Sequence, residues 1–436
     1  MRRVLGLLGV GGLSLALAGC WPVPGQDADR TSNNPFERRI TVDNVDELQE
    51  AWRRHYGGTD LAGPVVSGGA VHVVAWCQLG ALDPRTGDGR WAEPIAPELD
   101  SLCVSGARHH SGAPHVASDG ERVVASYGFT TVEAPGVLES TWATTVRNVA
   151  SGLVDGSAEV GFVQAERGTQ LAGLTTEAVG PGTQATTLRL AEIDGAAGRS
   201  LRTAIAPAQV EFPDETVTLG REAVFHAGRG ILATEPGGSA QGQAVRAFSL
   251  TESRPGCGPV TAPQPFPGSY DLECPVWVQP TDGLPSAPVL RPGHATLYVR
   301  TDAGTLYALD AGTGAVQWTA GNLGSAGAPA LADGTLYVPT GDGRVVTFPA
   351  EGCGQATCAP TGEFATGATG AASTPVVAGT VLYVTAGGSV VAFDAAGCPS
   401  GPCAPLWSAP GEGAPVVSNG RVYVRSDVAL VAYALP

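Results

Sequence analysis

Short apolar strands alternate with glycine-rich turns through the last third of this chain, and the pattern repeats. In one unit the expected strands cover 328–331, 335–338 and 344–348, and the outer strand of the preceding unit covers 316–320. Asp-Gly pairs between strands supply the positive φ that tight hairpin turns require. Each unit therefore predicts one small antiparallel sheet. The units begin at Ser286, Gly327, Ser373 and Gly413.

A repeated unit of about 40 residues made of short strands is typical of a propeller blade, because one such sheet must stack on neighbours to bury its faces. We predict an all-β fold, a β-propeller of about eight four-stranded blades. Seven is the alternative, because the repeat is faint in the middle of the chain. The predicted blades lie near 63–95, 112–163, 168–206, 221–279, 286–320, 327–367, 373–409 and 413–436.

The last predicted blade has room for only three strands before Pro436. It would leave an open sheet edge, which invites aggregation. Residues 47–54 precede the first blade and contain Trp52, a residue type that recurs on the outer strands. We predict that this segment closes the ring as the fourth strand of the last blade. A helix over 46–55 is the competing interpretation.

The N-terminus has the layout of an export signal. Arg2 and Arg3 precede an apolar run over 4–18, and the sequence Leu-Ala-Gly leads to Cys20. Small residues before a cysteine resemble a bacterial lipobox, in which the cysteine is acylated and becomes the mature N-terminus. A plain signal peptide and a single membrane anchor are the alternatives. We expect a signal peptide over 1–19, a lipid on Cys20, a flexible tether over 20–45 and a propeller over 46–436.

The lipid on Cys20 would hold the protein on the extracytoplasmic surface of the cell membrane or outer membrane. After the signal peptide, no apolar run is long enough for a membrane-spanning helix. The basic residues are all arginine, and the formal net charge is −16. Because an acidic surface repels nucleic acid, we expect no nucleic-acid partner. We expect a monomer.

The remaining cysteines fall in near pairs, and an even set in an exported chain indicates disulfides. Two of the pairs occupy equivalent places in consecutive repeats, which favours pairing within a blade. No histidine lies near either of these Cys-x4-Cys segments, which argues against zinc, an ion that takes four convergent ligands. The expected disulfides are Cys77–Cys103, Cys257–Cys274, Cys353–Cys358 and Cys398–Cys403.

Three histidines cluster at His109, His110 and His115. Adjacent residues on a strand point to opposite faces, so solvent-facing loop histidines are favoured over a metal site. The aspartates of the repeated turns lack the alternating carboxylates of a calcium loop, so they indicate turn chemistry. These turn residues are Asp302, Asp310, Asp333 and Asp342.

Tryptophan recurs at one position of the repeat, at Trp91, Trp318 and Trp407. This regularity favours packing between blades over a sugar-stacking platform. The sequence has no Gly-x-Ser-x-Gly elbow, phosphate loop or nucleotide fingerprint. We therefore expect no catalytic, cofactor-binding or metal-binding residues.

The stretch 305–314 followed by Trp318 resembles the repeat of quinoprotein-like β-propellers, and 81–87 with Trp91 is similar. The resemblance is clear over 63–91 and 286–436. One branch of this superfamily comprises pyrroloquinoline-quinone dehydrogenases, with calcium and a catalytic aspartate on the propeller axis. Many of these enzymes also have a vicinal disulfide. The chain has no adjacent cysteines and no matching calcium ligand set, so no cofactor is expected.

A non-catalytic branch contains a lipoprotein of the outer-membrane β-barrel assembly machinery. This chain is similar to it in lipobox, tether, blade number and N-terminal closure, although no binding residue can be carried over. The resemblance implies a membrane-anchored extracytoplasmic scaffold that binds a protein or cell-envelope partner and is not an enzyme. A quinoprotein oxidoreductase and a carbohydrate-binding or hydrolytic propeller are the alternatives.

Overall fold

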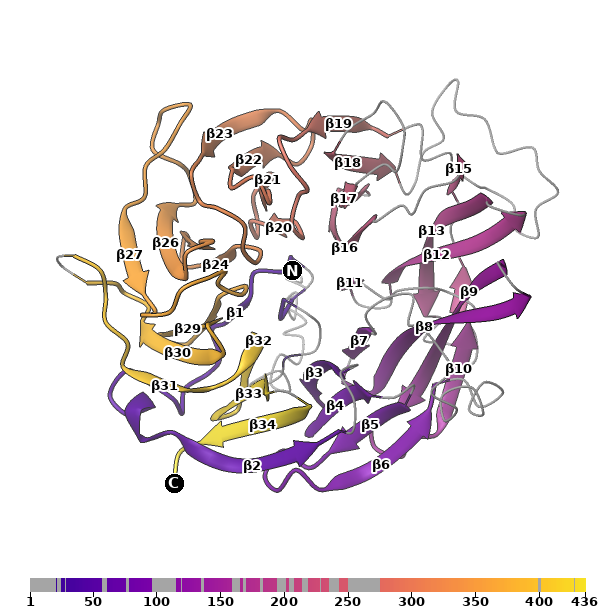
Figure 1. Cartoon of the computed structure of the whole chain (residues 1–436), viewed down its shortest axis with the longest axis horizontal. Helices are drawn as coiled ribbons and strands as arrows, with labels where there is room; N and C mark the ends of the chain where they lie inside the picture. Colours follow the sequence, from indigo (N-terminus) through magenta and orange to yellow (C-terminus); the bar gives the residue numbers. More distant parts are fainter. Residues whose placement is uncertain are drawn as a thin grey trace, which may run out of the picture.

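The strands form eight sheets that stand side by side around a common centre (Figure 1). This arrangement confirms the predicted all-β propeller, and each predicted blade range overlaps one sheet. The computed structural model describes residues 21, 25–27, 29–56, 61–75, 78–95, 115–118, 120–134, 137–158, 165–167, 170–180, 183–193, 201–203, 208–213, 219–227, 229–234, 243–249, 275–398, 401–426 and 428–436.

In the first half of the ring, successive strands of a sheet pair in antiparallel register, except in the third sheet, where β14 and β15 both pair with β13. The hairpins β8–β9 and β12–β13 are much longer than the rest, where the sequence carries insertions in the repeat. The first sheet holds β3 (Leu61–Ser67), β4 (Ala70–Ala75), β5 (Gln78–Leu82) and β6 (Gly89–Pro94). The second holds β7 (His115–Ser118), β8 (Arg122–Ala134), β9 (Val137–Asn148) and β10 (Val154–Ala158). The third holds β11 (Ala165–Arg167), β12 (Gln170–Gly180), β13 (Thr183–Ile193), β14 (Leu201–Thr203) and β15 (Ala208–Pro213), and the fourth holds β16 (Leu219–His226), β17 (Arg229–Thr234), β18 (Ala244–Ser249) and β19 (Trp277–Pro280).

The second half of the ring follows the sequence repeat, and its last two sheets also take up N-terminal strands. The fifth sheet holds β20 (Val289–Leu290), β21 (Thr296–Arg300), β22 (Leu306–Asp310) and β23 (Val316–Ala320). The sixth holds β24 (Ala330–Ala332), β25 (Thr335–Pro339), β26 (Arg344–Pro349) and β27 (Gly362–Ala365). The seventh holds β28 (Val376–Ala378), β29 (Val381–Ala386), β30 (Ser389–Asp394) and β31 (Trp407–Pro410), with β1 (Asn33–Asn34), and the eighth holds β32 (Glu412–Ser418), β33 (Arg421–Ser426), β34 (Ala429–Ala434) and β2 (Gln49–His55).

The outer-strand tryptophans join neighbouring sheets. The indole of each lies against the segment that precedes the outer strand of the next sheet, which is the packing between blades that the sequence predicted for Trp91, Trp318 and Trp407. The indole nitrogens of Trp52, Trp91, Trp277 and Trp407 donate to the carbonyls of Pro84 (2.9 Å), Val149 (3.0 Å), Ala311 (3.2 Å) and Leu48 (3.1 Å). A Cβ at Gly87, Gly152, Gly314 or Gly352 would lie only 2.5–2.7 Å from Trp52, Trp91, Trp277 or Trp318.

The N-terminal strand β2 closes the ring, because it pairs in antiparallel register with β34, from Gln49 with Ala434 to His55 with Ala429. Figure 1 shows β2 on the outside of the ring, next to the C-terminal strand. The predicted closure is thereby confirmed. The competing helix over 46–55 is wrong, since the described helical structure there is one 3-10 turn, η1 (Val45–Glu47).

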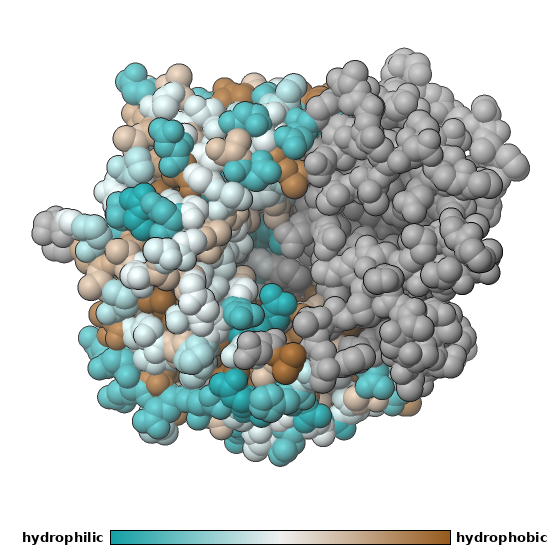
Figure 2. Space-filling view, viewed as in Figure 1, coloured by the Kyte–Doolittle hydropathy of each residue, from teal (hydrophilic) through white to brown (hydrophobic). Residues whose placement is uncertain are grey.

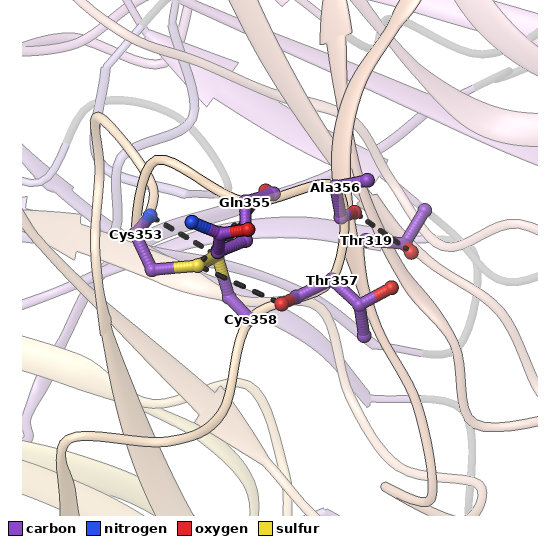
Figure 3. The surroundings of a disulfide bond; sticks show 6 residues. All are labelled: Thr319, Cys353, Gln355, Ala356, Thr357 and Cys358. Atoms are coloured by element: carbon purple, nitrogen blue, oxygen red, sulfur yellow. Dashed lines mark hydrogen bonds between the residues drawn. A yellow bond between two sulfur atoms is a disulfide. The ribbon is translucent and has the colours of Figure 1, made fainter.

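Two of the four expected cysteine pairs, Cys353–Cys358 and Cys398–Cys403, are disulfides in the structure. The loop closed by Cys353–Cys358 lies along the outer strand β23 of the preceding sheet (Figure 3). Thr319 donates to the carbonyl of Ala356 (2.9 Å) and accepts from the amide of Cys358 (2.8 Å). This loop therefore covers a sheet edge that would otherwise be open.

The second disulfide loop repeats this arrangement one sheet further on. The amide of Cys403 donates to Glu363 (2.9 Å), and the amide of Ala365 donates to Cys403 (3.1 Å). Both loops thus cover an edge and link two sheets. The pairs Cys77–Cys103 and Cys257–Cys274 lie outside the described residues.

The sequence predicted a flexible tether over 20–45. The structure corrects this prediction for residues 29–45, which pack on the propeller. Ile40 and Val45 are each 1 % exposed, and Asn34 is fully buried. The segment packs on the propeller because its carbonyl oxygens accept hydrogen bonds from backbone amides of the inner strands. Backbone contacts of this kind cannot be detected from the pattern of hydrophobic side chains.

We predict that Trp52→Ala lowers the free energy of unfolding by about 3–5 kcal/mol, because it removes a buried indole at the closing sheet. Val278→Ala, on the exposed outer strand β19, is the control and should change stability by no more than about 0.5 kcal/mol. Urea unfolding of both variants provides the test. Equal small losses would contradict the role of Trp52 in closure.

We predict that replacing Cys353 and Cys358 together by serine costs about 2 kcal/mol, as expected for a short closed loop. The variant should also self-associate, because the edge of β23 loses its cover. Chemical denaturation and light scattering at several protein concentrations measure the two effects. A variant that stays monomeric at all concentrations would show that the loop does not protect this edge.

Candidate functional site

The inner strands line a cavity on the propeller axis with a volume of about 300 Å³. Its walls are the segments that open the sequence repeats, in which alanine, threonine or glycine precedes proline. These small apolar side chains leave room for another segment of chain near the axis. The wall residues are Gly63, Pro64, Ala287, Val289, Ala328, Pro329, Thr374, Val376, Ala414, Pro415 and Val416.

Residues 29–40, here called the strap, run across the ends of the inner strands. Strand β1 in the strap pairs in parallel with β28, and Figure 1 shows it beside the centre of the ring. Amides of three consecutive sheets donate to strap carbonyls. These bonds join Leu290 to Asp29 (2.9 Å), Leu331 to Thr31 (2.8 Å), Val377 to Ser32 (3.0 Å) and Gly379 to Asn34 (3.0 Å).

Two buried side chains fasten the strap to the last sheet. The amide nitrogen of Asn34 donates to the carbonyl of Val417 (2.9 Å). The carboxylate of Glu37, only 3 % exposed, accepts from the amides of Gly420 (2.8 Å), Arg39 (2.8 Å) and Ile40 (3.3 Å). A buried carboxylate is tolerated only when it is hydrogen-bonded in this way.

The rest of the described lining of the axial cavity is formed by Trp21, Gly25, Arg30, Ser32, Leu61, Ala62 and Arg425. Trp21 is 2 % exposed, and its backbone exchanges two hydrogen bonds with Val66 (2.7 and 2.8 Å). Arg30 is also buried, and the guanidinium of Arg425 donates to the carbonyl of Leu61 (3.2 Å). The lining that the structure describes is therefore mainly apolar, with two guanidinium groups and the hydroxyls of Ser32 and Thr374, and it contains no carboxylate.

The two ends of the axis are formed by different turns of the sheets. We call the end with the hairpins between first and second strands the hairpin face, and the end with the loops between second and third strands the loop face. The strap lies at the hairpin face, since it contacts Gly379 and Gly420, which belong to such hairpins. Figure 2 shows a described surface that is mostly hydrophilic or neutral, with small separate hydrophobic patches.

A second cavity, of about 610 Å³, lies on the hairpin face between the strap and the hairpins β20–β21 and β24–β25. Its lining includes Asp27, Phe36, Arg291 and His294. Burial raises the pKa of Asp27, although hydrogen bonds from Thr31 oppose the shift. Phe36 is 53 % exposed, an unusual state for a large aromatic side chain.

The loop face carries aspartates. Asp342 lies in the loop between β25 and β26 and forms an ion pair with Arg344 (2.7 Å). Hydrogen bonds from Arg344 and Thr340 lower the pKa of Asp342 to about 2. Asp302, in the equivalent loop of the fifth sheet, accepts from the amide of Leu284 (2.8 Å). The carboxylate of Asp342 is therefore negatively charged across the physiological pH range.

The predicted aspartate turns are present: Asp310 accepts from the amides of Gly312 (3.0 Å) and Thr313 (2.8 Å). Within the described residues, no three histidine, cysteine, aspartate or glutamate side chains gather around a metal position. His115 begins β7, whereas Cys20, His109 and His110 lie outside the described residues. No helix in the described part is long and apolar enough to span a bilayer.

The strap was not predicted from the sequence, although it determines what occupies one end of the propeller axis. Its contacts are mainly backbone hydrogen bonds, and its polar residues are typical of a loop. The one usable signal was the pair of isolated apolar residues Ile40 and Val45, which a solvated tether would have no reason to carry.

Known proteins of the same fold were found by comparison. A family model described as outer membrane protein assembly factor BamB matches residues 275–398. No curated protein sequence matches the chain significantly.

Three solved structures illustrate the likeness. BamB from Moraxella catarrhalis has 13 % identity and a TM-score of 0.54, covering 89 % of this chain and 99 % of its own. The quinohemoprotein alcohol dehydrogenase from Comamonas testosteroni has 14 % identity and a TM-score of 0.57, covering 96 % of this chain and 81 % of its own. A europium-containing methanol dehydrogenase has 13 % identity and a TM-score of 0.60, covering 95 % and 90 %.

At these identities the structural likeness shows the fold alone. The chain is similar in fold both to BamB and to the dehydrogenases. The sheet topology and the family match over 275–398 agree with it. The chain is a β-propeller that resembles BamB, and its residues 275–398 match the PQQ-repeat family model.

Proposed function

We propose that this chain is a lipid-anchored, extracytoplasmic scaffold that binds a protein partner through the loops of its loop face. The observation that carries the proposal is the occupation of the axis by the chain's own strap. Scaffold propellers use their loops, whereas the quinoprotein dehydrogenases that the repeat resembles use the axis for their cofactor.

The described residues around the axis do not fit a quinone and calcium. Calcium takes six to eight oxygen ligands, many of them carboxylates. The described lining of the axial cavity offers Arg30, Arg425 and Trp21 among small apolar residues, and its volume is only about 300 Å³. The strap backbone, fixed by three inner-strand amides and the hairpin amide of Gly379, stands at one end of this space.

The location follows from the N-terminal sequence and the likeness to BamB. The Leu-Ala-Gly-Cys20 sequence has the form of a lipobox, and BamB is by its family description an outer membrane protein assembly factor. We infer the same kind of position for this chain, at a membrane on the extracytoplasmic side. Disulfides at Cys353–Cys358 and Cys398–Cys403 suit an oxidising compartment.

The partner's chemistry follows from the loop face. Asp302 and Asp342 project from equivalent loops, and the whole chain carries a formal charge of −16. Charge complementarity sets orientation and association rate more than affinity. We therefore infer that the partner presents a basic surface to these loops.

Site-specific crosslinking in cells tests this proposal. A photo-reactive amino acid in place of Ala303, an exposed residue of the loop face, should give a discrete crosslinked protein. The same group at Val278 on the outer rim should not. Asp342→Arg should reduce the crosslink several-fold, whereas Glu351→Arg, a 70 % exposed control on the opposite face, should leave it unchanged. Equal crosslinking at both positions would contradict a loop-face partner.

We also predict that the purified protein has no quinone-dependent dehydrogenase activity. Calorimetric titration with pyrroloquinoline quinone in the presence of calcium should show no saturable binding, because the described axial lining offers the ion no carboxylate. Saturable binding followed by reduction of an artificial electron acceptor with an alcohol or a sugar would favour the oxidoreductase instead.

A further inference from the structure

We propose that the hairpin face of the propeller lies directly on the bilayer, with strap residues 35–39 in contact with the phospholipid headgroups. The inference rests on the lipid at Cys20 in the proposed function, and it adds the orientation of the propeller on the membrane.

The first argument is that no flexible linker separates the lipidation position, Cys20, from the first residue that is fixed to the propeller, Trp21. Trp21 follows Cys20 in the sequence, and consecutive Cα atoms lie only 3.8 Å apart. Trp21 is buried, and its backbone is fixed to Val66 by two hydrogen bonds. Val66 is the last residue but one of β3, next to the hairpin that leads to β4. The acyl chains would therefore leave the propeller near its axis on the hairpin face.

The second argument is the chemistry that the strap exposes at that face. Pro35, Phe36, Arg38 and Arg39 are exposed, while Glu37 between them is buried with its carboxylate on three backbone amides. Neither Arg38 nor Arg39 forms an ion pair with another described residue. Aromatic and arginine side chains together are typical of the membrane interface, because one part enters the apolar boundary and the other pairs with phosphate.

The third argument is that this orientation keeps the opposite face accessible. The loop-face residues Asp302 and Asp342 lie at the other end of the axis from the strap. The turns of the hairpin face also carry carboxylates, such as Asp310, Asp333 and Asp394, so the contact with headgroup phosphates is local and comes from Arg38 and Arg39. The loop face stays free for a partner.

Lipid-based fluorescence quenching on the full-length acylated protein tests the orientation. Phe36→Cys and Val278→Cys introduce a thiol at sites of similar exposure, 53 % and 41 %. Each variant is labelled with the same fluorophore and reconstituted into vesicles of phosphatidylethanolamine and phosphatidylglycerol that contain a spin-labelled lipid. Quenching at position 36 should be several-fold stronger than at position 278. A glycine-serine insertion between Cys20 and Trp21, or Arg38→Glu with Arg39→Glu, should reduce it.

The failure of this inference differs from the failure of the proposed function. Mass spectrometry of the N-terminal peptide reports acylation of Cys20 independently of orientation. An acylated protein with equal quenching at both positions would overturn the flat orientation and leave the anchored scaffold intact. An N-terminus without acyl chains would overturn the lipid anchor and, with it, the orientation. Stronger quenching at position 36 that falls on linker insertion supports the proposal.

Discussion

The pairing of β2 with β34 is the constraint on which the rest of the molecule depends. A ring of sheets buries its faces only when every sheet has two neighbours, and the last sheet has three strands of its own. The N-terminal strand supplies the fourth and brings Trp52 onto the turn of the first sheet. Trp407 of the seventh sheet packs on the opposite side of the last sheet, where it donates to Leu48 next to β2. Two indoles therefore stabilise the position at which the chain's ends meet.

Closure also explains the strap. Because β2 lies on the outside of the ring while Trp21 is buried at the axis, the intervening chain has to cross one face of the propeller. On the way, its carbonyls satisfy the amides of three inner strands, and Glu37 meets the hairpin at Gly420. The axis is thereby committed to the chain's own backbone. Dehydrogenases and BamB share this fold. The occupied axis is the feature that leads us to propose a scaffold and not an enzyme.

The repeated features could be predicted well from the sequence, because each repeat places the same residue types at the positions where a blade needs them. Asp-Gly turns, Ala-Pro inner strands and outer tryptophans such as Trp91 and Trp318 set the sheets, their boundaries and their packing. Trp52 and the three-strand last blade were sufficient to predict closure. The disulfide loops were predicted as pairs, but their cover of the edges of β23 and β27 was not, since that depends on how consecutive sheets stack.

The strap could not be predicted in the same way. Its fixed position comes from backbone carbonyls at residues such as Asp29, Thr31 and Ser32, and backbone groups are identical in every sequence. The same applies to the candidate site. Its walls could be predicted from the Ala-Pro repeats, whereas the segment that fills one end of it was predicted to be a solvated tether. Arg30 and Arg425 likewise carry no pattern that places them at the axis.

Hydrogen exchange of the inner-strand amides tests the central claim most directly. The amides of Leu290, Leu331, Val377 and Gly379 have strap carbonyls as their acceptors. In the full protein they should exchange slowly, and in a variant that lacks residues 21–40 but keeps β2 they should exchange much faster, with the β2–β34 amides unchanged. Rates that are the same with and without the strap would contradict an axis occupied by the chain itself.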